Sequence, residues 1–239
     1  MLNIGQIKKL IGALFIMALL IFTSFPVRAA EDDLYDFLWL DPDKSVYVLQ
    51  NKEFPKSKTQ YVDIGYLSSL TPNFHDSRGA NINIGHFFNE ELGAEIIYNV
   101  YNNKNNASYD NVKRINGTVP FARKIDQSYG AAAIWSPFYG KINTFNKIYY
   151  FDFYFGLGVL KMNASSNATT ATNVNADVFS DENYTAGLVK AGLKFHVNKR
   201  FHFVLEFQNI YYRAYGPIQA NGKSLESNSD VILKMGISI

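Results

Sequence analysis

Residues 149–159, YYFDFYFGLGV, alternate between large apolar side chains and small or polar ones. The odd positions are Tyr, Phe, Leu and Val, whereas the even positions from 152 to 158 hold Asp152, Tyr154 and two glycines. Successive side chains of a β-strand point to opposite faces, so a period of two predicts a strand rather than a helix. This segment therefore predicts a strand with one apolar face and one face of small or polar residues.

The same period of two recurs along the chain after residue 59. Seven further segments show it, the fourth less regularly than the others: 60–66, 80–85, 92–98, 125–135, 187–197, 201–208 and 231–239. Helical periodicity is absent after residue 30, except for a turn or two at 33–40. The sequence therefore predicts an all-β protein with eight strands.

The connections between these segments alternate in length. Short turns are expected at 89–91 and 198–199, a medium connection at 136–146, a shorter first loop at 71–78, and long polar loops at 102–124, 161–183 and 213–228. The Asn-rich residues 102–106 and the low-complexity residues 163–176 have no apolar face to bury, so they are expected to be solvated loops. Short turns at one end and long polar loops at the other are typical of transmembrane barrels.

The distribution of residue sizes decides which face meets lipid. An eight-stranded barrel is just wide enough inside for side chains, and inward Phe, Leu and Ile from six strands would overfill it. Small residues with a few paired charges fit that interior. The sequence therefore predicts an eight-stranded antiparallel up-and-down transmembrane β-barrel in the cell outer membrane, its apolar face on outer-membrane lipid. The alternative is a soluble periplasmic ligand-binding barrel of the lipocalin type.

The first 29 residues have the features of a secretory signal peptide. Lys8 and Lys9 precede an uncharged apolar run at 10–22, and Val27 and Ala29 occupy the −3 and −1 positions of a cleavage site. The alternative is an uncleaved anchor, although a bilayer needs about 20 apolar residues. We therefore expect a signal peptide at 1–29, a periplasmic N-terminal segment at 30–58 and the outer-membrane β-barrel at 59–239.

The N-terminal segment contains an apolar, aromatic stretch at 34–40, LYDFLWL, followed by the turn Asp41-Pro42-Asp43-Lys44. An exposed apolar stretch of this kind is a liability unless something covers it. Two interpretations remain open. Residues 31–58 could dock a periplasmic partner, or they could form a lid over the periplasmic mouth of the barrel.

Charge and cysteine usage exclude several classes of protein. The chain has 239 residues and a formal charge of +2; beyond the predicted signal peptide it has 20 basic and 21 acidic residues. No basic field marks a nucleic-acid partner. The absence of cysteine excludes disulfides, thiolate metal sites and cysteine nucleophiles.

Two short stretches carry a family resemblance. They are Val46–Lys52 (VYVLQNK), followed by the strand from Tyr61, and Pro137–Lys141 (PFYGK), which leads into Tyr150–Tyr154. Both resemble the outer membrane β-barrel domain family of predatory and gliding Gram-negative bacteria, and as a pattern the similarity spans residues 34–239. The resemblance implies fold and location but transfers no functional residue. Assembly signals at such C-termini usually end in Phe or Tyr, so Ile239 implies weaker or different recognition by the outer-membrane assembly machinery.

Seven charged residues fall on the small-residue face near the middle of their strands: Asp63, Glu95, Asp152, Lys190, Lys194, Glu206 and Lys234. Buried charges must be paired. If the turn at 198–199 closes a hairpin, Glu206 lies opposite residues near 192, within diagonal reach of Lys190 and Lys194. We expect an interior ion-pair network that plugs the barrel; the alternative is the charged lining of a small pore or channel.

No catalytic or metal site is expected. His75-Asp76-Ser77 has the residue types of a hydrolase triad, but adjacent residues cannot point at one another as a triad requires, so this stretch is expected to be a polar loop. His86, His196 and His202 lack metal-ligand spacing, and no cofactor is implied. The sequence thus predicts a small non-enzymatic outer-membrane protein whose activity, if any, lies in surface loops, as contact or adhesion.

Overall fold

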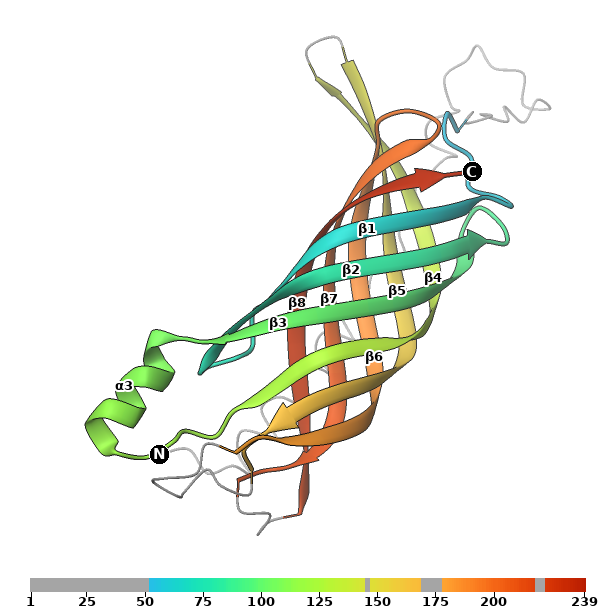
Figure 1. Cartoon of the computed structure of the whole chain (residues 1–239). Helices are drawn as coiled ribbons and strands as arrows, with labels where there is room; N and C mark the ends of the chain where they lie inside the picture. The colour runs from blue at the N-terminus through green and yellow to red at the C-terminus, as the bar shows by residue number, and fades with distance from the viewer. Residues whose placement is uncertain (1–51, 145–146, 169–177, 218–221) are drawn as a thin grey trace, which may run out of the picture. The chain divides into compact units, whose positions relative to one another are not determined.

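The computed structural model describes residues 52–144, 147–168, 178–217 and 222–239 (Figure 1). The predicted signal peptide, with Val27 and Ala29 at its cleavage site, lies outside the described residues, as does the apolar stretch at 34–40. These two expectations therefore stay predictions.

Eight antiparallel strands form a closed barrel in chain order. Their bounds are β1 (Gln60–Ser69), β2 (His75–Phe87), β3 (Leu92–Asn105), β4 (Arg123–Thr144), β5 (Lys147–Ser166), β6 (Ser180–His196), β7 (Phe201–Tyr215) and β8 (Lys223–Ser238). Each strand pairs with the next, and β8 pairs with β1 from Tyr61↔Ser238 to Ser69↔Asp230. The predicted eight-stranded up-and-down architecture is confirmed, and closure leaves neither β1 nor β8 as a free edge.

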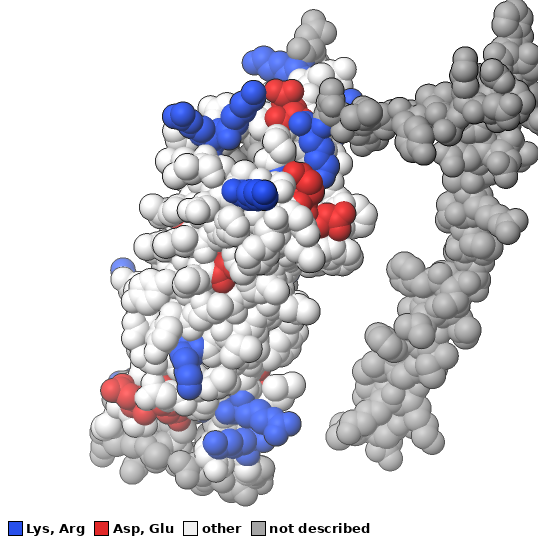
Figure 2. All heavy atoms as spheres, turned by 90° about the vertical axis from the view of Figure 1, so that its right-hand side faces the viewer, with Lys and Arg blue, Asp and Glu red and all other residues white. Residues whose placement is uncertain are grey.

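The predicted faces are confirmed along the strand that decided the fold. Leu157 and Val159 in β5 are 65% and 61% exposed, whereas Asp152 and Tyr154 are buried inside. On the face shown in Figure 2, charged side chains gather toward the two ends and the middle is almost entirely uncharged. The barrel therefore has an apolar outer belt and a polar interior.

The two ends of the barrel differ. The turn end holds the connections at 88–91 and 197–200 together with the start of β1 and the end of β8. The loop end holds the longer connections, including the helix α3 (Ala107–Asn116). No helix in the described part of the chain is long and apolar enough to cross a membrane.

Several strands are longer than their periodicity predicted. Residues 136–144 continue β4 and pair with β5 beyond the last contact with β3 at Trp135, so the predicted connection at 136–146 is wrong. The resulting two-stranded ribbon rises past the other strands at the turn end (Figure 1), and its register shifts at Pro137, which has no amide to donate.

The predicted long loops at 161–183 and 213–228 are likewise partly strand. β5 and β6 pair as far as Ser166↔Ser180, and β7 and β8 as far as Tyr215↔Lys223. An antiparallel ladder is held by backbone hydrogen bonds, so it continues through polar sequence that has no apolar face. Periodicity alone therefore places these strand ends too early.

The expected polar loop at His75-Asp76-Ser77 is wrong as well, because these residues begin β2 and pair with β3 from His75↔Asn105 onward. Their register partners at 103–105 belong to the Asn-rich stretch that was expected to be a loop. Each polar stretch thus supplies the other with a hydrogen-bonding partner across the ladder.

The predicted loop at 102–124 contains the helix α3, which periodicity did not indicate. The Asn106 side chain accepts a hydrogen bond from the Tyr109 amide at 3.1 Å, and Gly117 ends the helix with φ of 65°. An Asn cap at the start and a left-handed Gly at the end are the local signals of such a helix. Only Tyr109 of α3 is buried, so the apolar stripe was too short to detect.

Candidate functional site in the barrel interior

The seven residues predicted to form the interior network all lie inside the barrel, each at most 5% exposed: Asp63, Glu95, Asp152, Lys190, Lys194, Glu206 and Lys234. They come from six strands, because each strand turns its small-residue face inward. Their partners follow from the way the barrel closes.

The centre of the interior is an ion-pair chain. Lys190 Nζ contacts Glu95 Oε1 and lies 3.0 Å from Glu206 Oε2, and Lys234 Nζ lies 2.7 Å from Glu206 Oε1. Glu206 stands opposite Gly192 in the ladder, as the hairpin geometry predicted. The structure thus brings Glu206 to Lys190 and adds Lys234, while Lys194 belongs elsewhere.

Two buried tyrosines complete the central cluster. The Tyr61 hydroxyl donates to Glu95 Oε2 at 2.7 Å, and the Tyr154 hydroxyl donates to Glu206 Oε2 at 2.5 Å. A Cβ on Gly192 would overlap the ring of Tyr154, so glycine is required at this close approach. The glycines on the inward face therefore make room for the tyrosines and the charged groups.

A second cluster lies toward the turn end. Asp152 Oδ1 accepts from Lys56 Nζ at 2.6 Å, and Asp152 Oδ2 lies 2.7 Å from His196 Nε2. Lys56 Nζ also donates to Ser136 Oγ at 2.8 Å. The ring of Phe54 stacks on His196 with centroids 4.7 Å apart.

A third contact joins β1, β7 and β8. His202 Nε2 lies 2.6 Å from Asp63 Oδ1, and Ser238 Oγ lies 3.2 Å from His202 Nδ1. A Cβ on Gly236 would overlap the Asp63 carboxylate, so glycine again makes the approach possible. The structure places His196 and His202 as partners of the buried aspartates Asp152 and Asp63.

Sequence reasoning missed Lys56, which comes from residues 52–59, here called the strap. The predicted set holds four carboxylates but only three lysines, and Lys56 supplies the fourth ammonium. The strap has no alternating pattern, so nothing local marked Lys56 as an interior residue. The strap thus takes part in the charge balance of the barrel.

The strap is fixed to the turn end by Glu90. This carboxylate accepts from the amides of Ser57 at 3.0 Å and Lys56 at 3.3 Å, and lies 3.4 Å from Lys52 Nζ. Burial raises the pKa of the Glu90 carboxyl, but the amide donors and Lys52 outweigh burial and hold this pKa below its usual range. The bonds that Glu90 makes therefore favour its ionised form.

Glu90→Gln is expected to loosen the strap. At neutral pH the amides of Lys56 and Ser57 should exchange with solvent deuterium faster than in the wild type, because a carboxamide is the weaker acceptor. Since the pKa of Glu90 is depressed by folding, its contribution is present above the unfolded pKa and is lost as pH falls through the folded pKa. Glu91→Gln is the matched control; equal exchange in both variants would contradict the anchoring role.

In the loop-end half of the interior, uncharged side chains donate hydrogen bonds to one more carboxylate, that of Asp230. Asp230 accepts from Tyr101 and Gln208 at 2.8 Å each and from Asn228 at 2.7 Å. Asp230 lies just before the predicted start of its strand, which is why sequence reasoning did not include it. The polar filling therefore continues toward the loop end.

The space left inside is small. At the level of the central cluster, a cavity lined by Asp63, Glu95 and Tyr154 has a volume of about 10 Å³. One water molecule needs about that much room. Within the residues that the structure describes, no group of three or more His, Cys, Asp or Glu side chains could hold a metal ion.

Comparison with known proteins gives matches among solved structures alone. No protein-family model and no curated protein matches the chain. The N-terminal β-barrel domain of Pseudomonas aeruginosa OprF is 13% identical over 77% of this chain and 98% of that one, with a TM-score of 0.47. The outer membrane protein OprG of the same species is 11% identical over 78% and 98%, with a TM-score of 0.45.

A third similar structure is Ail, the attachment invasion locus protein of Yersinia pestis. It is 14% identical over 77% of this chain and 99% of that one, with a TM-score of 0.41. At sequence identities this low, the likeness concerns the barrel fold alone. The resemblance to the family of predatory and gliding bacteria finds no family match and stays a prediction.

Proposed function

We propose that this chain is a non-enzymatic integral outer-membrane barrel whose interior is plugged and whose activity lies at the loop end. The observation that carries the proposal is the combination of an apolar outer belt with an interior filled by paired charges. Large apolar side chains on the outside of a closed barrel are stable in lipid, where every backbone group must be paired internally. The start of β1, the end of β8 and the short turns then face the periplasm.

The loop end supports a surface role because its connections pack into one structure. Tyr109 of α3 is buried with Val119 and Ala122, and Phe74 and Phe179 from two other connections pack against them. Three separate loops thus share a small apolar core at the loop end of the barrel. A shared core gives the loop end a defined surface, as a contact or adhesion role requires.

Hydrogen bonds further tie the loops together. The Asn167 side chain accepts from the Ala122 amide at 2.8 Å and donates to the Pro120 carbonyl at 2.9 Å. Arg123 donates to Glu182 at 2.9 Å, from β4 to β6. These bonds join the β3–β4 connection to the β5–β6 connection at the loop end.

The proposal is tested by conductance and by cell binding. The purified protein in planar bilayers is expected to show no steady unitary currents, because the central cavity leaves no continuous water column. Cells that display the protein should bind their target surface, and deletion of residues 107–117 should abolish binding while the barrel stays folded.

The opposite outcome is equally definite. Steady currents that change in Glu206→Gln and persist after deletion of residues 107–117 would move the function from the loops to the interior. Lys161→Gln, on the outer face of β5, is the matched control for the charge change. The predicted docking of a periplasmic partner through residues 31–58 remains a separate proposal, since the structure describes only 52–58 of that segment.

A further inference from the structure

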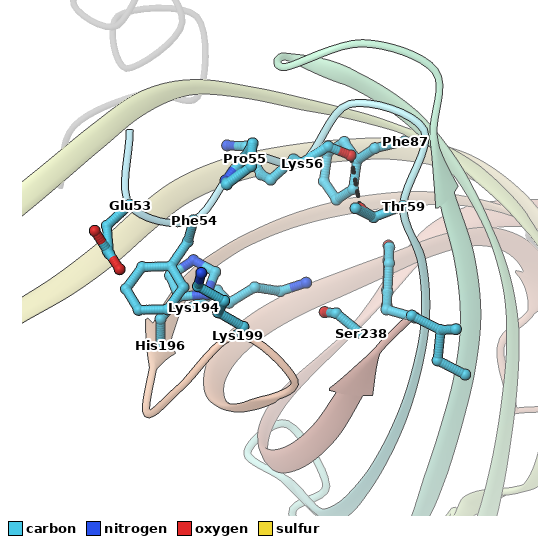
Figure 3. A pocket seen from close by; sticks show the side chains of 12 residues that line it. Glu53, Phe54, Pro55, Lys56, Thr59, Phe87, Lys194, His196, Lys199 and Ser238 are labelled. Atoms are coloured by element: carbon cyan, nitrogen blue, oxygen red, sulfur yellow. Dashed lines mark hydrogen bonds between the residues drawn. The ribbon is translucent and has the colours of Figure 1, made fainter. Parts of the chain in front are cut away.

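A cavity of about 220 Å³ lies at the turn end, between the strap and the barrel (Figure 3). Phe54 of the strap forms one wall, Tyr61 and Phe87 contribute apolar surface, and the Lys194 side chain extends toward Ser238. The cavity therefore combines aromatic surface with two buried lysines, Lys56 and Lys194, and of these Lys56 is paired with Asp152.

Lys194 differs from the other interior lysines in its partners. Lys194 is buried, with only 5% of the residue exposed. Its ammonium lies 4.0 Å from the ring centroid of Tyr61 and 5.6 Å from that of Phe87. Among the described residues, no carboxylate lies within 4.0 Å of Lys194 and no side chain or carbonyl accepts a hydrogen bond from it.

The nearby carboxylates are already engaged by other donors. Both oxygens of Asp152 and both oxygens of Glu95 have side-chain partners, and one oxygen of Asp63, Oδ1, is bound by His202. Lys194 lines the cavity, so its ammonium is left able to bind an acceptor that enters there. The cavity is the open space that this ammonium faces.

We propose that the cavity binds a small organic carboxylate with a compact apolar body. The carboxylate accepts hydrogen bonds from Lys194 Nζ, and the apolar body packs between Phe54 and Phe87. Cavities of about 150 Å³ hold benzene in other proteins, so the volume here suits a group of that size with a carboxylate attached. At the rim, Lys199 and Glu53 carry opposite charges, and Lys56 is paired with Asp152, which leaves Lys194 as the cation that selects an anion.

The test uses the full chain in detergent micelles and benzoate as the probe, observed by saturation-transfer NMR. Benzoate is expected to bind saturably, and benzamide, its neutral match, to bind at least about tenfold more weakly. Benzamide also controls for partition into the micelle. Equal saturation by the two probes would overturn the proposal.

Variants locate the binding. Lys194→Gln is expected to weaken benzoate binding by at least about tenfold. Phe54→Ala should weaken it several-fold through lost packing, and Lys223→Gln at the loop end should leave it unchanged. Unaltered binding in a folded Lys194→Gln protein contradicts the site. If that variant does not fold, the Phe54→Ala result decides, because Phe54 lies on the strap outside the barrel.

The carboxylate could come from a free small acid or from the C-terminus of a periplasmic peptide. The tripeptide Ala-Ala-Phe as free acid and as amide separates these sources. Free acid that binds more tightly than benzoate, with no binding of the amide, indicates peptide ends. Exclusion of both tripeptides, with benzoate still bound, indicates free acids.

Discussion

Replacement of Lys190 by Met is expected to lower the free energy of unfolding by about 3–5 kcal/mol, because it leaves two buried carboxylates without their shared cation. The Lys190 side chain is fully buried between Glu95 and Glu206. Among the residues that the structure describes, Glu206 would then keep Lys234 as its one cationic partner. Urea unfolding of the protein in lipid vesicles measures the change.

Two further variants show whether this loss is specific to the interior charges. Lys141→Met, on the exposed ribbon, should change the free energy of unfolding by less than about 0.5 kcal/mol. Adding Glu206→Gln to Lys190→Met should recover part of the loss, since contacting residues are not additive. A loss in Lys190→Met no larger than in Lys141→Met would show that the interior charges are solvated, as in an open pore.

Replacement of Leu157 by Arg is expected to cost about 2–4 kcal/mol if this position lies near the bilayer midplane. Leu157 is 65% exposed near the middle of the part of β5 that pairs with both neighbours. A charged side chain there loses hydration that lipid cannot replace. The measurement is again urea unfolding in vesicles.

The control for the lipid face is Ile142→Arg. Ile142 is equally apolar and 47% exposed, but it lies on the ribbon beyond the barrel. Its replacement should cost little. If Leu157→Arg were tolerated as well as Ile142→Arg, or if a carbonate wash released the wild type with the soluble periplasm, the barrel would be a soluble one.

Alternation in the sequence was sufficient to predict the eight strands and the face that each strand turns inward. The reason is local: the direction of a side chain in a strand depends only on the parity of its position. Leu157 and Asp152 were therefore assigned to opposite faces correctly. The same rule failed at 136–144 and at 161–166, where the ladder continues through residues without an apolar face.

Alternation in the sequence did not predict the helix α3 or the strap, for a related reason. The helix α3 rests on a cap at Asn106 and one buried ring, Tyr109, and the strap rests on contacts with Glu90 and Asp152, far away in sequence. Neither element has a repeating pattern in its sequence. Periodicity therefore cannot predict elements that are held by single tertiary contacts.

The sequence by itself determined that this chain forms a closed eight-stranded barrel with a charged interior, because parity and residue size are properties of each strand alone. The tertiary structure decided which charges meet. The register in which β8 closes on β1 and the fold of the strap set His202 against Asp63 and Lys56 against Asp152. Within the described part of the chain, they leave Lys194 without an acceptor. Those pairings depend on distances between segments far apart in sequence, which only closure of the barrel fixes.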